Sequence, residues 1–308
     1  MMARTLQNHV LHLRGWFSDV EPQTRLQARL GAFYRHGRRL VATPSGKMGL
    51  ALMAVFLTAA ALAPAFPLDD PIRQSLAERL LPPSSAHWFG TDHLGRDVFA
   101  RTVWGARPTF VIVFTVLAVS MPLGALLGTV SGLFGGIIDL VLMRVCDVFM
   151  AFPRLIFALA VAAAMGAGMG AAILAISLTA WAPYARVARA ETIVLRQSEF
   201  ILAARTMGAS RSRLLFRHAL PLALPSALVR AALDAPGIIL VVSGLGFLGL
   251  CIPAPTPEWG AMVADGRAIV FEAWWVSTLP GFMILLCGIG FNLLGDALRD
   301  VAATGEAR

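Results

Sequence analysis

Long apolar stretches alternate with short charged ones along most of this chain. Residues 48–66 carry no charged side chain, and a helix needs roughly 20 residues to cross a bilayer. Further apolar stretches follow at about residues 109–134, 155–165, 171–184, 225–248 and 275–294. The pattern therefore predicts an all-α polytopic membrane protein with six transmembrane helices.

A polar stretch, residues 67–107, separates the first two predicted spans. Asp97 precedes Arg101 at the i,i+4 spacing that favours an ion pair on a helix. Apolar residues at helical spacing predict a short helix over residues 98–104, lying on the membrane or protein surface. We expect Gly105 to end this helix before the second span begins.

Glycine recurs at every fourth position on one face of the second span, at Gly124, Gly128 and Gly132. Lipid provides no hydrophobic drive for helix association, so small residues that let two backbones approach mark a contact between helices. The repeat predicts a closely packed helix–helix seam.

Charged residues also occur within or beside the spans. Arg230 and Asp234 lie one helical turn apart in the fifth span, where a lone charge costs a few kcal/mol. We expect these two side chains to form an intramembrane pair. Arg144 and Asp147, at i,i+3 before the third span, are expected to pair and to face the bundle interior.

The distribution of basic residues predicts the topology. Residues 1–46 contain seven arginines against two acidic residues, so the positive-inside rule makes this basic N-terminal tail cytoplasmic. Residues 26–40 of the tail are either an amphipathic helix on anionic headgroups or part of a solvated chain. Six spans then also place residues 191–221 and the C-terminus in the cytoplasm.

Composition narrows the class further. The chain is 57% hydrophobic and 14% charged, whereas about a quarter of residues are charged in soluble domains. Its arginines lie between apolar segments and form no stripe with aromatic residues, which argues against nucleic acid as a partner. We expect no removable signal peptide in residues 1–46, and free cysteines at Cys146, Cys251 and Cys287.

The longest basic interruption, residues 199–221, has the pattern of two helices around a turn. Apolar residues recur at helical spacing before Gly208, which is suited to a sharp turn with positive φ. Ser210 is a candidate cap for a second helix, and Pro221 is expected to stop or kink it.

This stretch resembles the EAA loop of ABC importer permeases, whose pattern is Glu-Ala-Ala, three residues, Gly, nine residues, Ile-x-Leu-Pro. The matching positions are Ala203, Ala204, Gly208, Leu220 and Pro221. Leu202 stands in place of the motif Glu and His218 in place of Ile, which puts one ATPase contact in doubt.

Three other segments, FGTDHLGRDVFARTVWGAR, FLGLCIPAPTPEWGAMVADGR and GDALRD, resemble the dipeptide, oligopeptide and nickel subfamily of these permeases. By this resemblance the chain is identified as a member of that subfamily, and within it as the second, "C"-type permease.

The resemblance implies a type I ABC importer transmembrane domain over residues 47–308, with the coupling loop at about 191–221. Its expected ATPase-coupling residues are Glu199, Ala203, Ala204, Arg205, Thr206, Met207 and Gly208. Its expected external gate or loop contains Pro253, Pro255, Pro257 and Trp259. Trp259, Trp274 and Trp275 also suit the outer membrane interface as aromatic anchors.

The implied function is that of a transport subunit in the bacterial inner membrane, forming half of the path for peptides or a related small solute. Its implied partners are a homologous second permease, two cytoplasmic ABC ATPases and an external substrate-binding protein. The sequence has no GxxxxGK[ST] phosphate loop and no recognisable catalytic or metal motif. We therefore expect no enzyme activity and no cofactor in this chain, with ATP and Mg bound by the partner subunits.

The sequence is also compatible with other functions. The same architecture imports nickel or metal chelates, and an ATP-independent secondary transporter or channel is a rival from another class. Residues 199–221 alternatively form an ordinary amphipathic helix-turn-helix. The proline-rich stretch is alternatively a passive connection between the last two spans.

Overall fold

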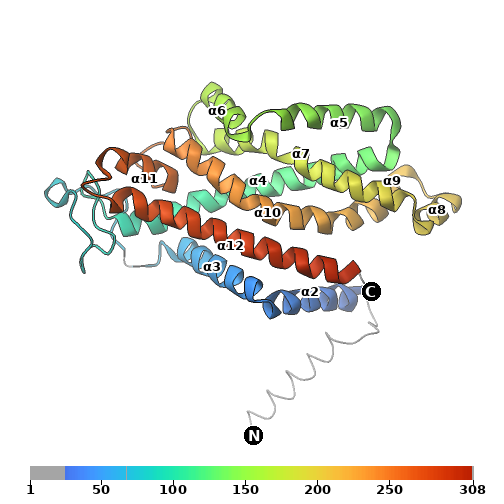
Figure 1. The fold of residues 1–308 in the computed structure, drawn as a ribbon, viewed down its shortest axis with the longest axis horizontal. Helices are drawn as coiled ribbons and strands as arrows, with labels where there is room; N and C mark the ends of the chain where they lie inside the picture. Colours follow the sequence, from blue (N-terminus) through green and yellow to red (C-terminus); the bar gives the residue numbers. More distant parts are fainter. Residues whose placement is uncertain (1–24, 67, 307–308) are drawn as a thin grey trace, which may run out of the picture.

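The apolar stretches form long helices that run side by side along the longest axis of the molecule (Figure 1). The computed structural model describes residues 25–66 and 68–306. Its long helices are α3 (Pro44–Leu62), α4 (Val98–Phe134), α7 (Met169–Arg196), α10 (Leu220–Phe247) and α12 (Trp275–Glu306). Within the described residues there is no strand, only an isolated bridge between Thr91 and Asp97. The predicted all-α class is confirmed.

The third predicted span is a bent pair of helices. α5 (Gly136–Ala151) and α6 (Arg154–Met165) meet at an angle of 87°. Pro153 lies at the break, where its ring and missing N–H oppose a continuous helix. Among the described residues, five helices are long and apolar enough to cross a membrane, or six if the bent pair is one span.

The remaining elements are short or lie at the ends of the bundle. α2 (Arg25–Ala42) runs into α3 and contacts α12, while residues 1–24 of the predicted basic tail lie outside the described residues. Whether α2 contacts anionic headgroups stays a prediction. The other pieces are α8 (Glu199–Thr206), α9 (Arg211–Arg213), a π-helix (Leu214–Ala219), α11 (Trp259–Gly266) and two 3₁₀ turns (Leu76–Glu78 and Arg267–Ile269).

The short surface helix expected over residues 98–104 was wrong, because these residues are the first turns of α4. Gly105 does not break the helix. A Cβ on Gly105 would lie 3.2 Å from Cδ1 of Trp259, so its missing side chain makes room for an indole ring. The Trp259 Nε1–H also donates to the Thr102 carbonyl at 2.8 Å, which fixes α11 to this part of α4.

The predicted glycine seam joins α4 to α7. A Cβ on Gly124 would overlap the carbonyl oxygen of Trp181, and one on Gly128 would overlap that of Ala185. A Cβ on Gly132 would lie 2.8 Å from the Arg189 carbonyl oxygen. The two backbones can therefore lie this close only because these positions carry no side chain.

We predict that Gly128→Ala destabilises the protein while Gly170→Ala does not. The added methyl group at Gly128 must push α7 away, and overpacking of this kind costs about 1–3 kcal/mol. Gly170 lies in α7 with nothing within 4 Å of an added Cβ, so it is a matched control. Thermal unfolding in detergent measures both variants, and equal melting temperatures would contradict the seam.

Candidate functional site

The predicted coupling loop forms one tip of the molecule, at the opposite end from α11 (Figure 1). α7 ends at Arg196, and Ser198 then starts α8 by accepting a hydrogen bond from the Ile201 N–H at 3.5 Å. Ser198 Oγ also donates to the Leu195 carbonyl at 2.7 Å, which ties the new helix to the end of α7. Ser198 thus fixes the local turn between α7 and α8.

Gly208 ends α8 in a Schellman motif. Its φ is +80°, and its N–H donates to the Arg205 carbonyl at 2.9 Å. The next N–H, of Ala209, donates to the Ala204 carbonyl at 3.0 Å, which completes the pair of bonds that defines the motif. Ser210 then accepts from the Arg213 N–H at 3.3 Å and caps α9. The turn at Gly208 and the Ser210 cap are confirmed.

The tip buries one face of α8 and exposes the other. Ile201 and Ala204 are buried, and Ala204 packs in a small core with Leu133, Leu214 and Leu215. Ala204 is therefore a packing residue here. The other expected coupling residues are exposed, namely Glu199, Ala203, Arg205, Thr206, Met207 and Gly208.

Large apolar side chains are exposed beside them. Met207 is 81% exposed, and Phe200, Leu202 and Phe216 are each at least half exposed. Leu202 occupies the position of the motif Glu, so the loop presents an apolar group there. Exposed apolar side chains gathered at a loop tip are typical of a surface that binds another protein.

Pro221 was expected to stop or kink the second helix, and it does not stop it. The chain is helical from Arg211 to Phe247, with π-helical spacing over Leu214–Ala219 just before the proline. Pro221 lies at the start of α10, directly after these π-helical residues. The tip therefore continues directly into a long spanning helix.

Asp234 is paired, but its partner is not Arg230. Asp234 Oδ1 lies 3.0 Å from Arg154 Nη1, and Oδ2 accepts from the Tyr184 hydroxyl at 2.9 Å. Both oxygens are thus occupied by residues of α6 and α7, while Arg230 is exposed. The bend between α5 and α6 brings Arg154 to this position, and no local spacing could have indicated it. Sequence reasoning missed Arg154 and Tyr184.

Asp147, of the second expected pair, lies closer to another arginine than to Arg144. Arg144 Nη1 lies 3.9 Å from Asp147 Oδ2, whereas Arg186 Nη2 of α7 donates to Asp147 Oδ1 at 2.5 Å. All three side chains are largely exposed. The expectation that Arg144 and Asp147 face the bundle interior was wrong for this chain.

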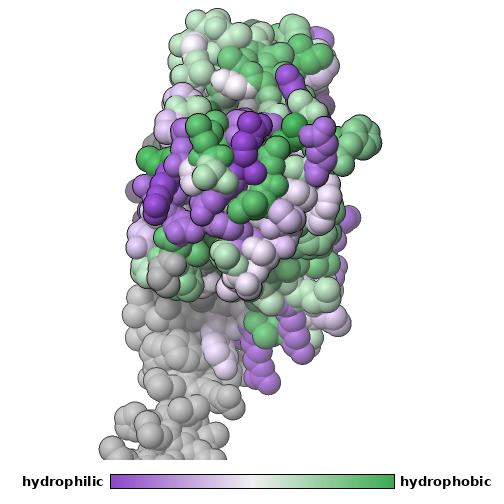
Figure 2. Space-filling view, turned by 90° about the vertical axis from the view of Figure 1, so that its left-hand side faces the viewer, coloured by the Kyte–Doolittle hydropathy of each residue, from purple (hydrophilic) through white to green (hydrophobic). Residues whose placement is uncertain are grey.

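The end that carries α11 presents many hydrophilic residues across its middle (Figure 2). Here Pro253 and Pro255 are exposed in a loop without regular structure, but Pro257 is buried. Trp259 is 1% exposed, so its expected role as an interfacial anchor was wrong. Trp275 is also buried, and of the three expected anchors only Trp274 is half exposed.

Glu258 holds the end of this loop against α11. Its carboxylate accepts from the Gly260 N–H at 3.0 Å and the Ala261 N–H at 2.9 Å. Burial raises the pKa of Glu258 to about 7, against the opposing effect of these two hydrogen bonds. A Cβ on Gly260 would overlap the Ser243 carbonyl oxygen, so Gly260 is a close-packing position.

Other candidate ligands fall into two sets. The three cysteines are free and buried, as expected. Among the described residues, Asp69, His87 and Asp97 form the group whose atoms lie close enough to hold a metal ion. Sequence reasoning missed this group because its members lie on three separate segments. Asp97 pairs there with His87 at 2.9 Å, so its expected pairing with Arg101 was wrong.

Residues 120–304 match the family described as "Binding-protein-dependent transport system inner membrane component". Over 286 residues the chain is 40% identical to the probable D,D-dipeptide transport system permease protein DdpC of Escherichia coli K12, covering 92% of this chain and 94% of the relative. It is 42% identical over 231 residues to the nickel transport system permease protein NikC of the same strain, covering 75% and 83%.

Similarity extends to further relatives and to a solved structure. The dipeptide transport system permease protein DppC of Bacillus subtilis is 37% identical over 264 residues, covering 85% of this chain and 82% of the relative. A chain of the MetNI methionine ABC transporter, in inward-facing conformations, matches with a TM-score of 0.50 at 23% identity. That match covers 67% of this chain and 95% of the other, and it shows a shared fold.

We predict that Arg154→Met destabilises the protein by about 3 kcal/mol, because it leaves the buried Asp234 carboxylate without its ionic partner, and that Asp234→Asn costs less, because Arg154 is only partly buried. The double variant should lose less than the sum of the two. Arg230→Met, in the exposed position once expected to pair, should change stability by less than about 0.5 kcal/mol. Unfolding in detergent measures the cycle, and additive losses would show that Arg154 and Asp234 are not coupled.

Proposed function

The chain belongs to the family of binding-protein-dependent transport system inner membrane components, and from this premise we propose that it imports dipeptides or a closely related small solute. It is a multi-pass permease subunit of the ABC importer type and resides in the bacterial inner membrane. The observation that carries the substrate class is the identity of 40% over 92% of the chain to a D,D-dipeptide permease.

The proposed assembly contains a homologous second permease, two cytoplasmic ATPases and an external substrate-binding protein. ATP and Mg belong to the ATPases, so hydrolysis takes place outside this chain. The proposed orientation places the α8–α9 tip and both termini in the cytoplasm and α11 outside. The basic residues support it, because Arg205, Arg211, Arg213 and Arg217 are exposed around the tip.

The tip is the proposed ATPase-docking surface. Its turn is fixed by the bonds of the Schellman motif, and its exposed face combines Met207 with small residues at Ala203 and Gly208. Because helical structure continues from Arg211 to Phe247, movement of a docked ATPase reaches the spanning region through one continuous helical stretch. Rigid-body rotation of spans would then alternate access to the path.

The proline-rich loop at residues 249–257 is the proposed external gate. Gly249 has φ +74° and nothing within 4 Å of an added Cβ, so its side of the loop has conformational freedom. Gly260 is packed against Ser243, so any movement pivots at Gly249 and not at both ends. A passive connection remains the competing role for this loop.

Nickel import is the second candidate, favoured by the 42% identity to a nickel permease over 75% of the chain.

One experiment separates the alternatives. The permease is tagged in its native host, isolated in mild detergent with its bound subunits, and reconstituted in vesicles with the binding protein. We expect ATPase subunits to co-purify, and labelled dipeptide to enter only with ATP and not with ADP. Uptake of nickel alone would support the second candidate, and ion-driven uptake without ATP would overturn the assignment.

We predict that Gly208→Val lowers ATP-driven uptake about tenfold, whereas Gly208→Asn retains most of it. Nothing lies within 4 Å of an added Cβ, so the cost comes from φ of +80°, which valine resists and asparagine tolerates. Both variants enlarge the same exposed position, which makes them a matched pair. Protein level in the membrane is measured alongside uptake. Equal uptake by the two variants would contradict a requirement for this turn.

A further inference from the structure

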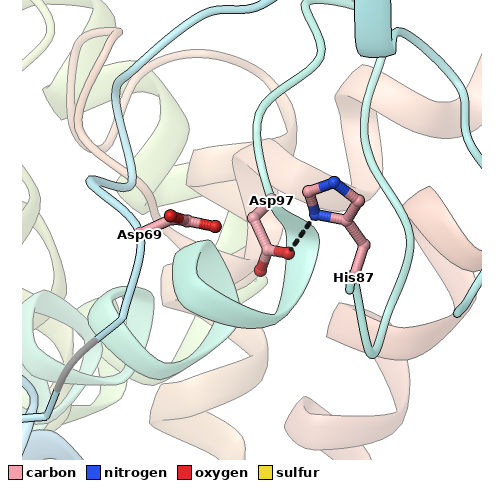
Figure 3. Close-up of side chains that lie close together, drawn as sticks. All are labelled: Asp69, His87 and Asp97. Atoms are coloured by element: carbon pink, nitrogen blue, oxygen red, sulfur yellow. Dashed lines mark hydrogen bonds and ion pairs between the residues drawn. The ribbon is translucent and has the colours of Figure 1, made fainter. Parts of the chain in front are cut away.

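Three metal-ligating side chains meet at the α11 end of the bundle. Asp69 follows α3, His87 lies in the polar stretch before α4, and Asp97 caps the start of α4. One ligand atom from each lies within 4.8 Å of the other two, and the side chains gather around Asp97 (Figure 3). We propose that they bind a divalent transition-metal cation of the zinc, cobalt or nickel class. This site goes beyond the proposed transport function and does not rest on it.

His87 and Asp97 already have the spacing of two ligands on one metal. His87 Nδ1 lies 2.9 Å from Asp97 Oδ2. Two ligands at about 2.1 Å from a cation are about 3.0–3.4 Å apart in octahedral or tetrahedral geometry. A cation can therefore replace the hydrogen bond with little movement. The second oxygen of Asp97 accepts from the Ala100 N–H at 2.7 Å, which keeps the carboxylate in place.

Asp69 supplies a second carboxylate to this group. Within the described residues it takes part in no hydrogen bond or ion pair, although it lies close to the Asp97 carboxylate. Its neighbour Asp70, by contrast, accepts a hydrogen bond from the Ile72 N–H at 3.0 Å. Two carboxylates at this separation repel each other, and a cation between them turns repulsion into attraction.

The surroundings favour binding. Asp69 and Asp97 line a cavity of about 500 Å³ whose other walls are apolar, including Phe66, Trp88 and Phe99. Apolar walls lower the local dielectric and strengthen attraction between cation and carboxylates, while the cavity has room for water ligands. The side chains of Asp97 and His87 are only 9% and 15% exposed, so both are held before the cation arrives.

The donor set selects the class of metal. One imidazole nitrogen with two carboxylates suits zinc, cobalt and nickel, whereas calcium and magnesium prefer oxygen ligands alone. A bound cation would join the end of α3, the polar stretch and the first turn of α4. The site therefore fastens these three segments together.

The test uses the full permease, prepared with a tag that contains no histidine, together with whichever subunits it retains. Equilibrium dialysis with zinc measures affinity, and the visible d–d absorption of added cobalt reports the ligand geometry. We expect Asp69→Asn to weaken zinc binding by at least about tenfold, since even residues that only hydrogen-bond to metal ligands contribute about 10–100-fold to metal affinity. Asp70→Asn makes the same charge change one residue away and should bind like the wild type.

His87→Asn provides a second readout, because loss of the imidazole should reduce the preference for zinc over magnesium. Asp69 is exposed and, among the described residues, takes part in no hydrogen bond or ion pair, so we expect its substitution to leave the fold intact. Equal zinc affinity of the wild type, Asp69→Asn and Asp70→Asn would overturn the proposal. So would a cobalt spectrum that is the same in the wild type and in His87→Asn.

Discussion

The backbones of α4 and α7 approach so closely that a carbonyl oxygen of one helix occupies the place of a side chain on the other. Lipid tails are as apolar as leucine, so no hydrophobic effect drives helices together in a bilayer. Close contact between backbones must hold them together instead. The rest of the bundle depends on it. α7 is held where its Tyr184 reaches Asp234, and α8 follows directly from the end of α7. A shift in the seam would move both the buried network and the tip.

Charged groups then join helices that are far apart in the sequence. Arg154 and Asp234 connect the bent span to α10, and Asp139 of α5 receives two hydrogen bonds from Arg189 of α7 at 2.5 and 2.7 Å. The last two side chains sit near the point where α4 gives way to α5. The bent span has few buried residues of its own, so it depends on these polar contacts more than the straight helices do.

Features encoded locally could be predicted from the sequence. The length of the apolar stretches predicted the spans, the glycine at every fourth position predicted the seam, and Gly208 with Ser210 predicted the turn. Each of these features depends on residues that are neighbours along one segment of the chain. Side-chain partners could not be predicted in this way. The spacing of Arg230 and Asp234 was favourable, but an 87° bend brought Arg154 to the same carboxylate. Tryptophan is a residue type typical of membrane interfaces, yet the indole of Trp259 packs inside the protein, in the space beside Gly105.

The uninterrupted helical stretch from Arg211 to Phe247 is also a lever arm. Its 37 residues span about 55 Å at 1.5 Å per residue, so a tilt of about 5° about one end displaces the other end by about 5 Å. The tip is attached at one end of this arm and the proline-rich loop at the other. Small angular changes at the tip thus become displacements as wide as a side chain at the opposite end of the molecule.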